Sequence, residues 1–141
     1  MSVEKTYLSW NDFDLLTKQI VQYYQSSDIK LIVGLSRGGL PLSVTLSNLM
    51  GIPMVPLEWQ TRDGSAQDMD KLITLNMEYT SSEVLFVDDL CDSGTTIKQI
   101  QGFFEDPKFA TLIDKLPQEG LVQYAPIIDD SNSWIVFPWE Y

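Results

Sequence analysis

The stretch from Val84 to Thr96 constrains this chain more than any other part of its sequence. Four apolar residues, 84–87, run into the adjacent acids Asp88 and Asp89, and a turn of small polar residues follows. A short apolar run is typical of a buried strand, so the two carboxylates are expected at its end, where they can meet a diol or a metal. The amides and hydroxyls of such a turn, at the mouth of a helix, can hold a phosphate. A ribose that carries a 5′-phosphate is one ligand that needs both features.

Composition limits the classes of function that remain. The chain has 141 residues, 44% of them hydrophobic, which is enough for a core, and we expect residues 1–141 to form a single domain. No apolar run approaches the ~18–20 residues that span a bilayer, and residues 1–5 lack the apolar core of a signal peptide, so we expect a cytoplasmic protein. The absence of histidine and the single cysteine, Cys91, exclude His-based catalysis, His-ligated zinc and internal disulfides. The net charge of −11 disfavours nucleic acid, and an anionic ligand would need local positive charge.

The pattern of apolar residues predicts alternating strands and helices. We expect helices at 10–24, with Ser9 as N-cap, at 40–50, with Gly51 as the stop, and at 95–104. We expect strands at 31–35, 54–59, 72–77, 83–89 and 109–113, with Pro56 marking an edge strand, and a long functional loop at 60–71. This order predicts an α/β domain with a largely parallel central sheet flanked by helices. Ligands bind such sheets at the carboxyl ends of the strands, so the loops 36–39 and 88–96 can share one site.

Residues 84–96 resemble, over thirteen consecutive positions, the phosphoribosyl-pyrophosphate (PRPP) signature of the type I phosphoribosyltransferases. The resemblance covers most of the chain and implies the fold of that family, with a small C-terminal hood that binds a base. It implies that Asp88 and Asp89 meet the ribose hydroxyls and that Asp89 contacts Mg²⁺, a cation that needs few carboxylates beside substrate oxygens and water. The turn residues that the resemblance assigns to PRPP binding are Asp92, Ser93, Gly94, Thr95 and Thr96.

The loop 36–39 contains two glycines, which allow close approach to an anion, and an arginine, whose planar donors suit phosphate. It is similar to the pyrophosphate loop of the family. This similarity predicts that Ser36, Arg37 and Gly38 bind PRPP. The other arginine of the chain, Arg62, lies in the loop 60–71. The corresponding mobile loop of the family often carries a Ser-Tyr pair, whereas this chain has Thr-Arg, a departure that bears on loop closure and turnover.

Two further fragments resemble the xanthine–guanine branch of the family. Lys115 follows an apolar strand, and Trp134 and Ile135 lie in the C-terminal segment. That branch uses a Lys, a Trp and the next Ile to bind its base, so these three residues are predicted to bind a 6-oxopurine. An indole can stack on a purine, and an ammonium can donate to O6 but would repel the 6-amino group of adenine. By the same resemblance Asp92 takes a proton from the base and completes the catalytic set with Asp88 and Asp89; its alternative role is to cap the following helix.

Other interpretations stay open at the level of sequence. The acidic segment can be an ordinary turn, or part of a phosphorelay receiver, although receivers carry their paired acids on the first strand. The fold can also serve a non-catalytic regulatory protein that binds PRPP or a nucleotide, or an enzyme for another base such as orotate or uracil. The favoured hypothesis is an Mg²⁺-dependent enzyme that transfers a 5-phosphoribosyl group from PRPP to N9 of guanine, xanthine or hypoxanthine and releases pyrophosphate. We expect a homo-oligomer, a dimer or a tetramer, without nucleic-acid or membrane partners.

Overall fold

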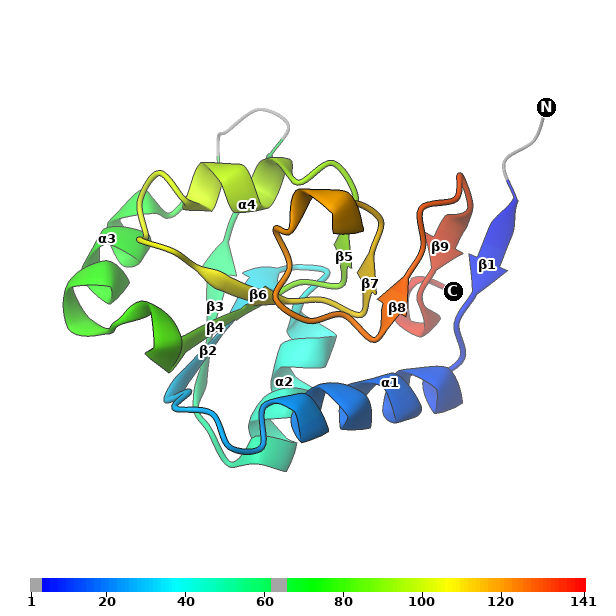
Figure 1. Cartoon of the computed structure of the whole chain (residues 1–141), viewed down its shortest axis with the longest axis horizontal. Coiled ribbons are helices and arrows are strands. Elements are labelled where there is room, and N and C mark those ends of the chain that lie inside the picture. Colours follow the sequence, from blue (N-terminus) through cyan, green and yellow to red (C-terminus); the bar gives the residue numbers. More distant parts are fainter. Residues whose placement is uncertain (1–3, 62–65) are drawn as a thin grey trace.

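The computed structural model describes residues 4–61 and 66–141. At its centre lies a four-stranded sheet with the order β3-β2-β4-β6 (Figure 1). Its strands are β2 Leu31–Ser36, β3 Met54–Glu58, β4 Val84–Val87 and β6 Lys108–Ala110. Each strand pairs with its neighbour in parallel. The predicted α/β class and parallel sheet are confirmed, and Pro56 lies in β3 at the sheet edge, as expected.

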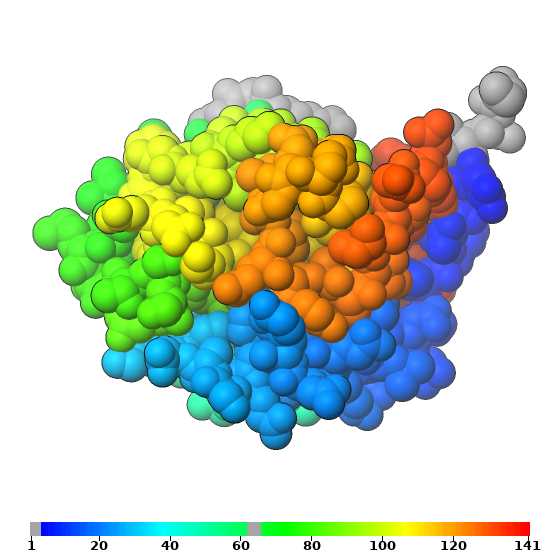
Figure 2. Space-filling model, viewed as in Figure 1, coloured from blue at the N-terminus to red at the C-terminus, as the bar shows by residue number. Residues whose placement is uncertain are grey.

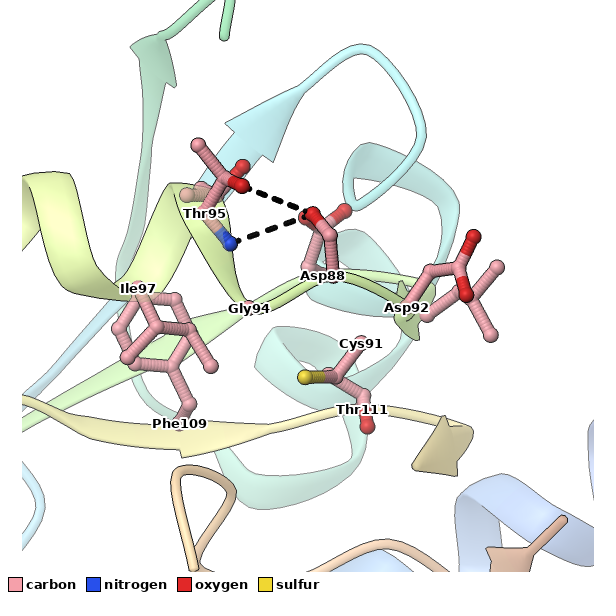
Figure 3. Close-up of a pocket in the computed structure, with 11 residues that line it drawn as sticks. Asp88, Cys91, Asp92, Gly94, Thr95, Ile97, Phe109 and Thr111 are labelled. Atoms are coloured by element: carbon pink, nitrogen blue, oxygen red, sulfur yellow. Dashed lines mark hydrogen bonds between the residues drawn. The ribbon is translucent and has the colours of Figure 1, made fainter. Parts of the chain in front are cut away.

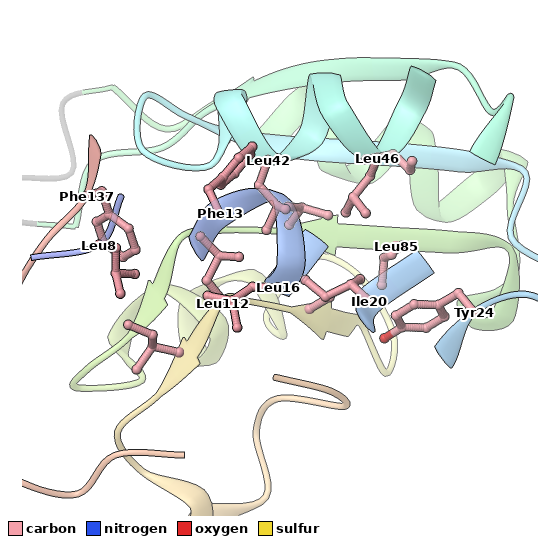
Figure 4. Packing of buried hydrophobic residues seen from close by; sticks show 14 of the residues in the cluster. Leu8, Phe13, Leu16, Ile20, Tyr24, Leu42, Leu46, Leu85, Leu112 and Phe137 are labelled. Atoms are coloured by element: carbon pink, nitrogen blue, oxygen red, sulfur yellow. The ribbon is translucent and has the colours of Figure 1, made fainter. Parts of the chain in front are cut away.

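Helices cover both faces of this sheet, because its central strands are apolar on both sides. The helices are α1 Trp10–Tyr23, α2 Leu40–Met50, α3 Met69–Glu78 and α4 Thr95–Ile100. Alternate residues of β4 enter two separate cores: Leu85 and Val87 pack with α1 and α2, whereas Val84 and Phe86 pack with α3 and α4. Figure 4 shows the first core, where Leu85 of β4 lies near Leu46 of α2 and Ile20 of α1.

Local signals set the ends of the first two helices. The Ser9 side chain accepts the N–H of Asp12, and the Asp12 carboxylate accepts the N–H of Ser9, so a capping box satisfies two free donors at the start of α1. Helix α2 ends at Gly51, whose φ of 66° lies in the left-handed region that favours glycine. The helices predicted at 10–24 and 40–50 are therefore confirmed together with their caps.

The strand predicted at 72–77 is wrong, because this segment lies in α3. Leu72 and Leu75 are buried while the residues between and after them are exposed, which is helical spacing. The Asp68 carboxylate caps the helix by accepting the N–H of Lys71. The loop predicted at 60–71 accordingly ends before Met69, and its residues 62–65, which include Arg62, lie outside the described part of the chain.

Three other predicted elements are shorter than expected. The helix predicted at 95–104 ends at Ile100, and the strand predicted at 83–89 ends at Val87, before the two acids. The strand predicted at 109–113 divides after Ala110, because the next strand joins a different sheet. The Thr111 hydroxyl, which donates to the carbonyl of Ile113 at 2.9 Å, stabilises this bend.

The C-terminal part of the chain builds two small parallel sheets beside the central one. One has the order β5-β7-β8, made of Leu90–Cys91, Ile113–Asp114 and Ile127–Ile128; the other pairs β1 Lys5–Tyr7 with β9 Trp134–Val136. Three 3₁₀ helices, η1 Ser81–Glu83, η2 Pro117–Glu119 and η3 Pro138–Glu140, complete the described elements. We call residues 111–141 the hood. It lies against α1 (Figure 2), where Tyr124 stacks on Tyr23 with ring centroids 4.3 Å apart.

Across residues 4–61 and 66–141, none of the helices combines the length and the apolar character that a membrane crossing requires.

Candidate active site

Two loops meet at the carboxyl edge of the central sheet. Because β2 and β4 are adjacent and parallel, the loop 36–39 after β2 and the segment 88–96 after β4 emerge at the same edge. Their approach is close: a Cβ atom at Gly38 would lie 2.5 Å from Asp89 Oδ2, and one at Gly39 would lie 2.4 Å from a carbonyl oxygen of β4. Glycine at both positions is therefore a packing requirement of the site.

The loop 36–39 brings positive charge to this edge. Ser36 is the last residue of β2 and is half-buried, whereas Arg37 is exposed to solvent. The peptide bond between them is cis. Because Arg37 is exposed, its guanidinium is accessible to an anion that approaches this edge from solvent.

Asp88 and Asp89 face different parts of the site. Asp88 lines a cavity beside the turn 92–96, and Asp89 lines a second cavity under the hood. Asp88 Oδ1 accepts the backbone N–H of Asp89 at 2.9 Å. Burial raises the pKa of Asp88 well above its ordinary value, and the neighbouring charge of Asp89 adds to this shift. Burial also raises the pKa of Asp89, and the charge of Glu140 adds to it. Ionisation of both carboxylates is therefore unfavourable here, and a bound cation would favour their ionised forms.

The chemistry of this donor set fits Mg²⁺ that arrives together with an anionic substrate. Within the described residues, no group of three or more His, Cys, Asp or Glu side chains is arranged to hold a metal. Mg²⁺ does not need one, because it usually takes one or two carboxylates and completes its octahedron with water and substrate oxygens. Asp88 and Asp89 supply that number of carboxylates.

The turn after the acids encloses the first cavity, of about 120 Å³ (Figure 3). The Ser93 and Thr95 hydroxyls lie 2.9 Å apart, and Ser93 Oγ also accepts the N–H of Thr95 at 3.3 Å. Gly94 has a φ of 76°, and a Cβ there would lie 2.5 Å from the Leu121 side chain. In the free protein the hydroxyls of the turn thus bond to one another, while Ser93 and Thr95 remain exposed to an incoming ligand.

Cys91 lies at the base of this cavity and is buried. Burial raises the pKa of its thiol to about 11, and the nearby acids, beginning with Asp114, add to the shift. Cys91 therefore stays a neutral thiol near neutral pH.

The second cavity, of about 290 Å³, brings together the three residues predicted to bind a base. Lys115, Trp134 and Ile135 all line it, along with Asp89 and Glu140. The Trp134 side chain is 64% exposed, so its ring offers a free face, whereas Ile135 is buried. Lys115 Nζ donates to the carbonyl oxygens of the hood residues Ser131 and Ser133.

The two cavities adjoin. Leu90 and Asp92 line both of them, so one extended ligand can reach from the turn at 92–96 to the hood. Sequence reasoning gave no role to Glu140, which lines the second cavity and accepts the N–H of Phe137 at 2.8 Å. A Glu three residues after the start of a turn is a capping pattern, which signals this hydrogen bond but not the position in the cavity.

Comparison with known proteins agrees with this geometry. The family model described as "Phosphoribosyl transferase domain" matches residues 4–141. A purine phosphoribosyltransferase from Pyrococcus horikoshii shares 25% sequence identity, with a TM-score of 0.71 and coverage of 99% of this chain and 96% of that one.

Two further solved structures share the fold. The xanthine-guanine-hypoxanthine phosphoribosyltransferase of Helicobacter pylori has 23% identity and a TM-score of 0.70, and covers 99% of this chain and 94% of its own. A hypothetical protein from Neisseria gonorrhoeae with bound ppGpp has 19% identity and a TM-score of 0.73, and covers 100% of this chain and 92% of its own. With a family model that spans nearly the whole chain and a site built at the carboxyl edge of its sheet, the protein belongs to the phosphoribosyltransferase domain family.

Proposed function

We propose that this protein is a cytoplasmic purine phosphoribosyltransferase that transfers the 5-phosphoribosyl group of PRPP to N9 of a 6-oxopurine. The observation that carries the proposal is the pair of adjoining cavities, one beside the turn 92–96 and lined by Asp88, the other lined by Asp89 and the exposed Trp134. A nucleoside monophosphate has the same layout: phosphate, ribose and base in a row. The first two parts match the turn and the acids, and the base matches the hood.

In this proposal the two loops bind PRPP from both sides. Residues Ser93–Thr96 hold the 5′-phosphate through hydroxyls and backbone amides. Arg37 and the backbone of the loop 36–39 hold the pyrophosphate, whose negative charge grows as its bond to C1 of the ribose breaks. Asp88 and Asp89 bind the ribose hydroxyls, and Asp89 holds Mg²⁺, which when bound neutralises charge on the phosphate oxygens.

The hood orients the base for attack. The purine stacks on Trp134, and the Lys115 ammonium donates to O6. The backbone near Ile135 meets the opposite edge of the ring. As N9 forms its bond to the ribose, the base loses a proton, and we assign its acceptance to Asp92, which borders both cavities. A 6-amino group would face the ammonium, so we expect adenine to be a poor substrate.

A second candidate function is binding of a nucleotide or PRPP for regulation, without turnover. The specific observation in its favour is the similar fold of the N. gonorrhoeae protein with bound ppGpp. Such a ligand joins guanine to phosphate groups, so it could occupy the same two cavities. The departure of the loop 60–71 from the family pattern also favours this candidate.

One experiment separates the two functions. Purified protein is incubated with PRPP, Mg²⁺ and guanine, xanthine, hypoxanthine or adenine, and nucleotide and pyrophosphate are quantified by chromatography. Formation of a 6-oxopurine nucleotide supports the enzyme, and a double Asp88→Asn, Asp89→Asn variant that folds but makes none serves as the control. Calorimetric binding of PRPP or ppGpp with no product from any base would establish the regulatory function instead.

A further inference from the structure

The Lys115 ammonium is enclosed by the hood before any base binds. Its Nζ donates to the carbonyl oxygen of Ser131 at 2.7 Å and to that of Ser133 at 2.8 Å. Asp129 Oδ2 lies 4.0 Å away, and the Lys115 side chain is only 10% exposed. An ammonium has three N–H donors. Because two are engaged with the hood, a single N–H remains for a ligand in the second cavity.

Asp129 builds the turn that carries those two carbonyls. Its backbone N–H donates to the carbonyl of Asp114 at 3.1 Å, which continues the β7–β8 pairing. Its Oδ1 accepts the N–H of Ser131 at 2.9 Å, and the Ser131 hydroxyl in turn accepts the N–H of Ser133 at 3.2 Å. One carboxylate oxygen thus closes the turn while the other faces the Lys115 ammonium. The attraction to the Lys115 ammonium depends on the ionised form of Asp129, whereas Oδ1 can accept the Ser131 N–H in either form.

These two contacts also favour the ionised form of Asp129. Hydrogen bonds from Ser131 lower the pKa of Asp129, and the charge of Lys115 lowers it further. The carboxylate is therefore ionised throughout the neutral range.

Building on the function proposed above, we propose that Asp129 is a positioning residue that sets base selectivity by fixing the direction of the one free N–H of Lys115. A fixed N–H donor strengthens the binding of a purine with an acceptor at position 6. It weakens the binding of a purine with a 6-amino group, because the ammonium cannot move away from that group. Without the carboxylate, the ammonium gains freedom to retreat from the cavity. Binding of a 6-oxopurine then weakens, and the penalty on adenine falls with it.

The test compares Asp129→Asn and Asp129→Ala with Asp130→Asn. The asparagine keeps an oxygen that can accept the Ser131 N–H but removes the charge, whereas alanine removes both. Asp130 is adjacent and exposed, so its replacement makes the same change in net charge at the next position. The readouts are KM for guanine and xanthine, KM for PRPP, kcat, and the ratio of kcat/KM for guanine to that for adenine.

We expect Asp129→Asn to raise KM for the 6-oxopurine on the order of 10- to 100-fold, the scale expected when a binding group is misplaced by about 1 Å. The guanine-to-adenine ratio should fall, while KM for PRPP and the melting temperature stay close to those of the unaltered protein. Asp130→Asn should match the unaltered protein. A merely structural role would raise both KM values and lower the melting temperature together, and that result, or unchanged selectivity in Asp129→Asn, overturns the proposal.

Failure of the proposed function is recognised separately, because then the unaltered protein makes no nucleotide from any base. In that case amide hydrogen exchange over residues 130–135 tests the positioning role of Asp129, since this measurement needs no turnover. Faster exchange there in Asp129→Ala, which loses the acceptor of the Ser131 N–H, than in Asp129→Asn and Asp130→Asn supports the role of Asp129 in holding the turn that positions Lys115. Equal exchange in all four proteins contradicts it.

Discussion

Replacing Gly38 by alanine should damage the site without damaging the fold. An added Cβ would lie 2.5 Å from Asp89 Oδ2, 2.9 Å from Asp89 Cγ and 3.2 Å from Asp89 Oδ1, so its three nearest atoms all belong to one side chain. Ordinary contacts of a Cβ atom begin near 3.4 Å, and the carboxylate must therefore retreat by about 0.9 Å. Gly38 is not among the glycines of positive φ, so alanine can adopt its backbone conformation.

The size of the effect follows from what has to move. Rotating the end of one aspartate costs little, and alanine lowers the entropy of the unfolded chain by about 0.4–1 kcal/mol relative to glycine. The free energy of unfolding should consequently change by less than about 1 kcal/mol. A displacement of about 1 Å in a catalytic group, by contrast, costs on the order of 100-fold in rate. We therefore expect kcat/KM for PRPP to fall on the order of 100-fold in Gly38→Ala.

The assay measures initial rates with PRPP, Mg²⁺ and guanine, and urea unfolding of the same preparations. Gly102→Ala is the matched control, because a Cβ there would approach only a backbone oxygen, at 3.2 Å. In the background of Asp89→Asn the further loss caused by Gly38→Ala should shrink, since the two changes act on one group. Full activity of Gly38→Ala, or a loss of stability of several kcal/mol, would refute the reasoning.

Four further predictions test other parts of the structure. Burial raises the pKa of Asp88, so between pH ~3.8 and that raised pKa the folded chain binds more protons than the unfolded chain. The free energy of unfolding therefore falls as pH rises through this range. In thermal scans, Asp88→Asn should raise the melting temperature at pH 7 more than at pH 4. A Cβ at Gly34 would lie 2.3 Å from the buried Ser43 Oγ, and Gly34→Ala should cost about 1–3 kcal/mol in urea unfolding. Trp134→Ala should raise KM for the base and leave KM for PRPP near its normal value, because Trp134 lines the second cavity and not the first. PRPP with Mg²⁺ should raise the melting temperature of the unaltered protein but much less that of Asp89→Asn.

Much of the fold could be predicted because its signals are local. Short apolar runs bounded by turn residues are typical of strands buried on both sides, and this pattern predicted β2 and β4. The Ser9 capping box and the glycine at position 51 set helix ends through hydrogen bonds a few residues long. Segment 84–96 combines a buried strand, two acids and a turn of the kind that binds phosphate. Because these residues are contiguous, this part of the candidate site could be predicted from the sequence alone.

The remaining features depended on contacts between distant segments. Residues 72–77 are compatible with a strand or a helix as a short apolar run, and packing of Leu72 and Leu75 beneath β4 decided for a helix. The strand predicted at 109–113 divides because Ala110 pairs with the central sheet while Ile113 pairs with β5, a choice made by neighbours rather than by propensity.

The hood shows the same division most clearly. The resemblance to a known family predicted a base-binding role for Lys115 and Trp134. It did not predict the hydrogen bonds of 2.7 Å and 2.8 Å that engage two of the three donors of Lys115. Nor does the chain alone reveal that Gly38 leaves room for Asp89, which lies some fifty positions away. Local periodicity and capping depend on residues that are close together in the sequence, so they can be predicted from it. Which N–H faces a ligand, and how far a carboxylate can move, are set by atoms that only folding brings together.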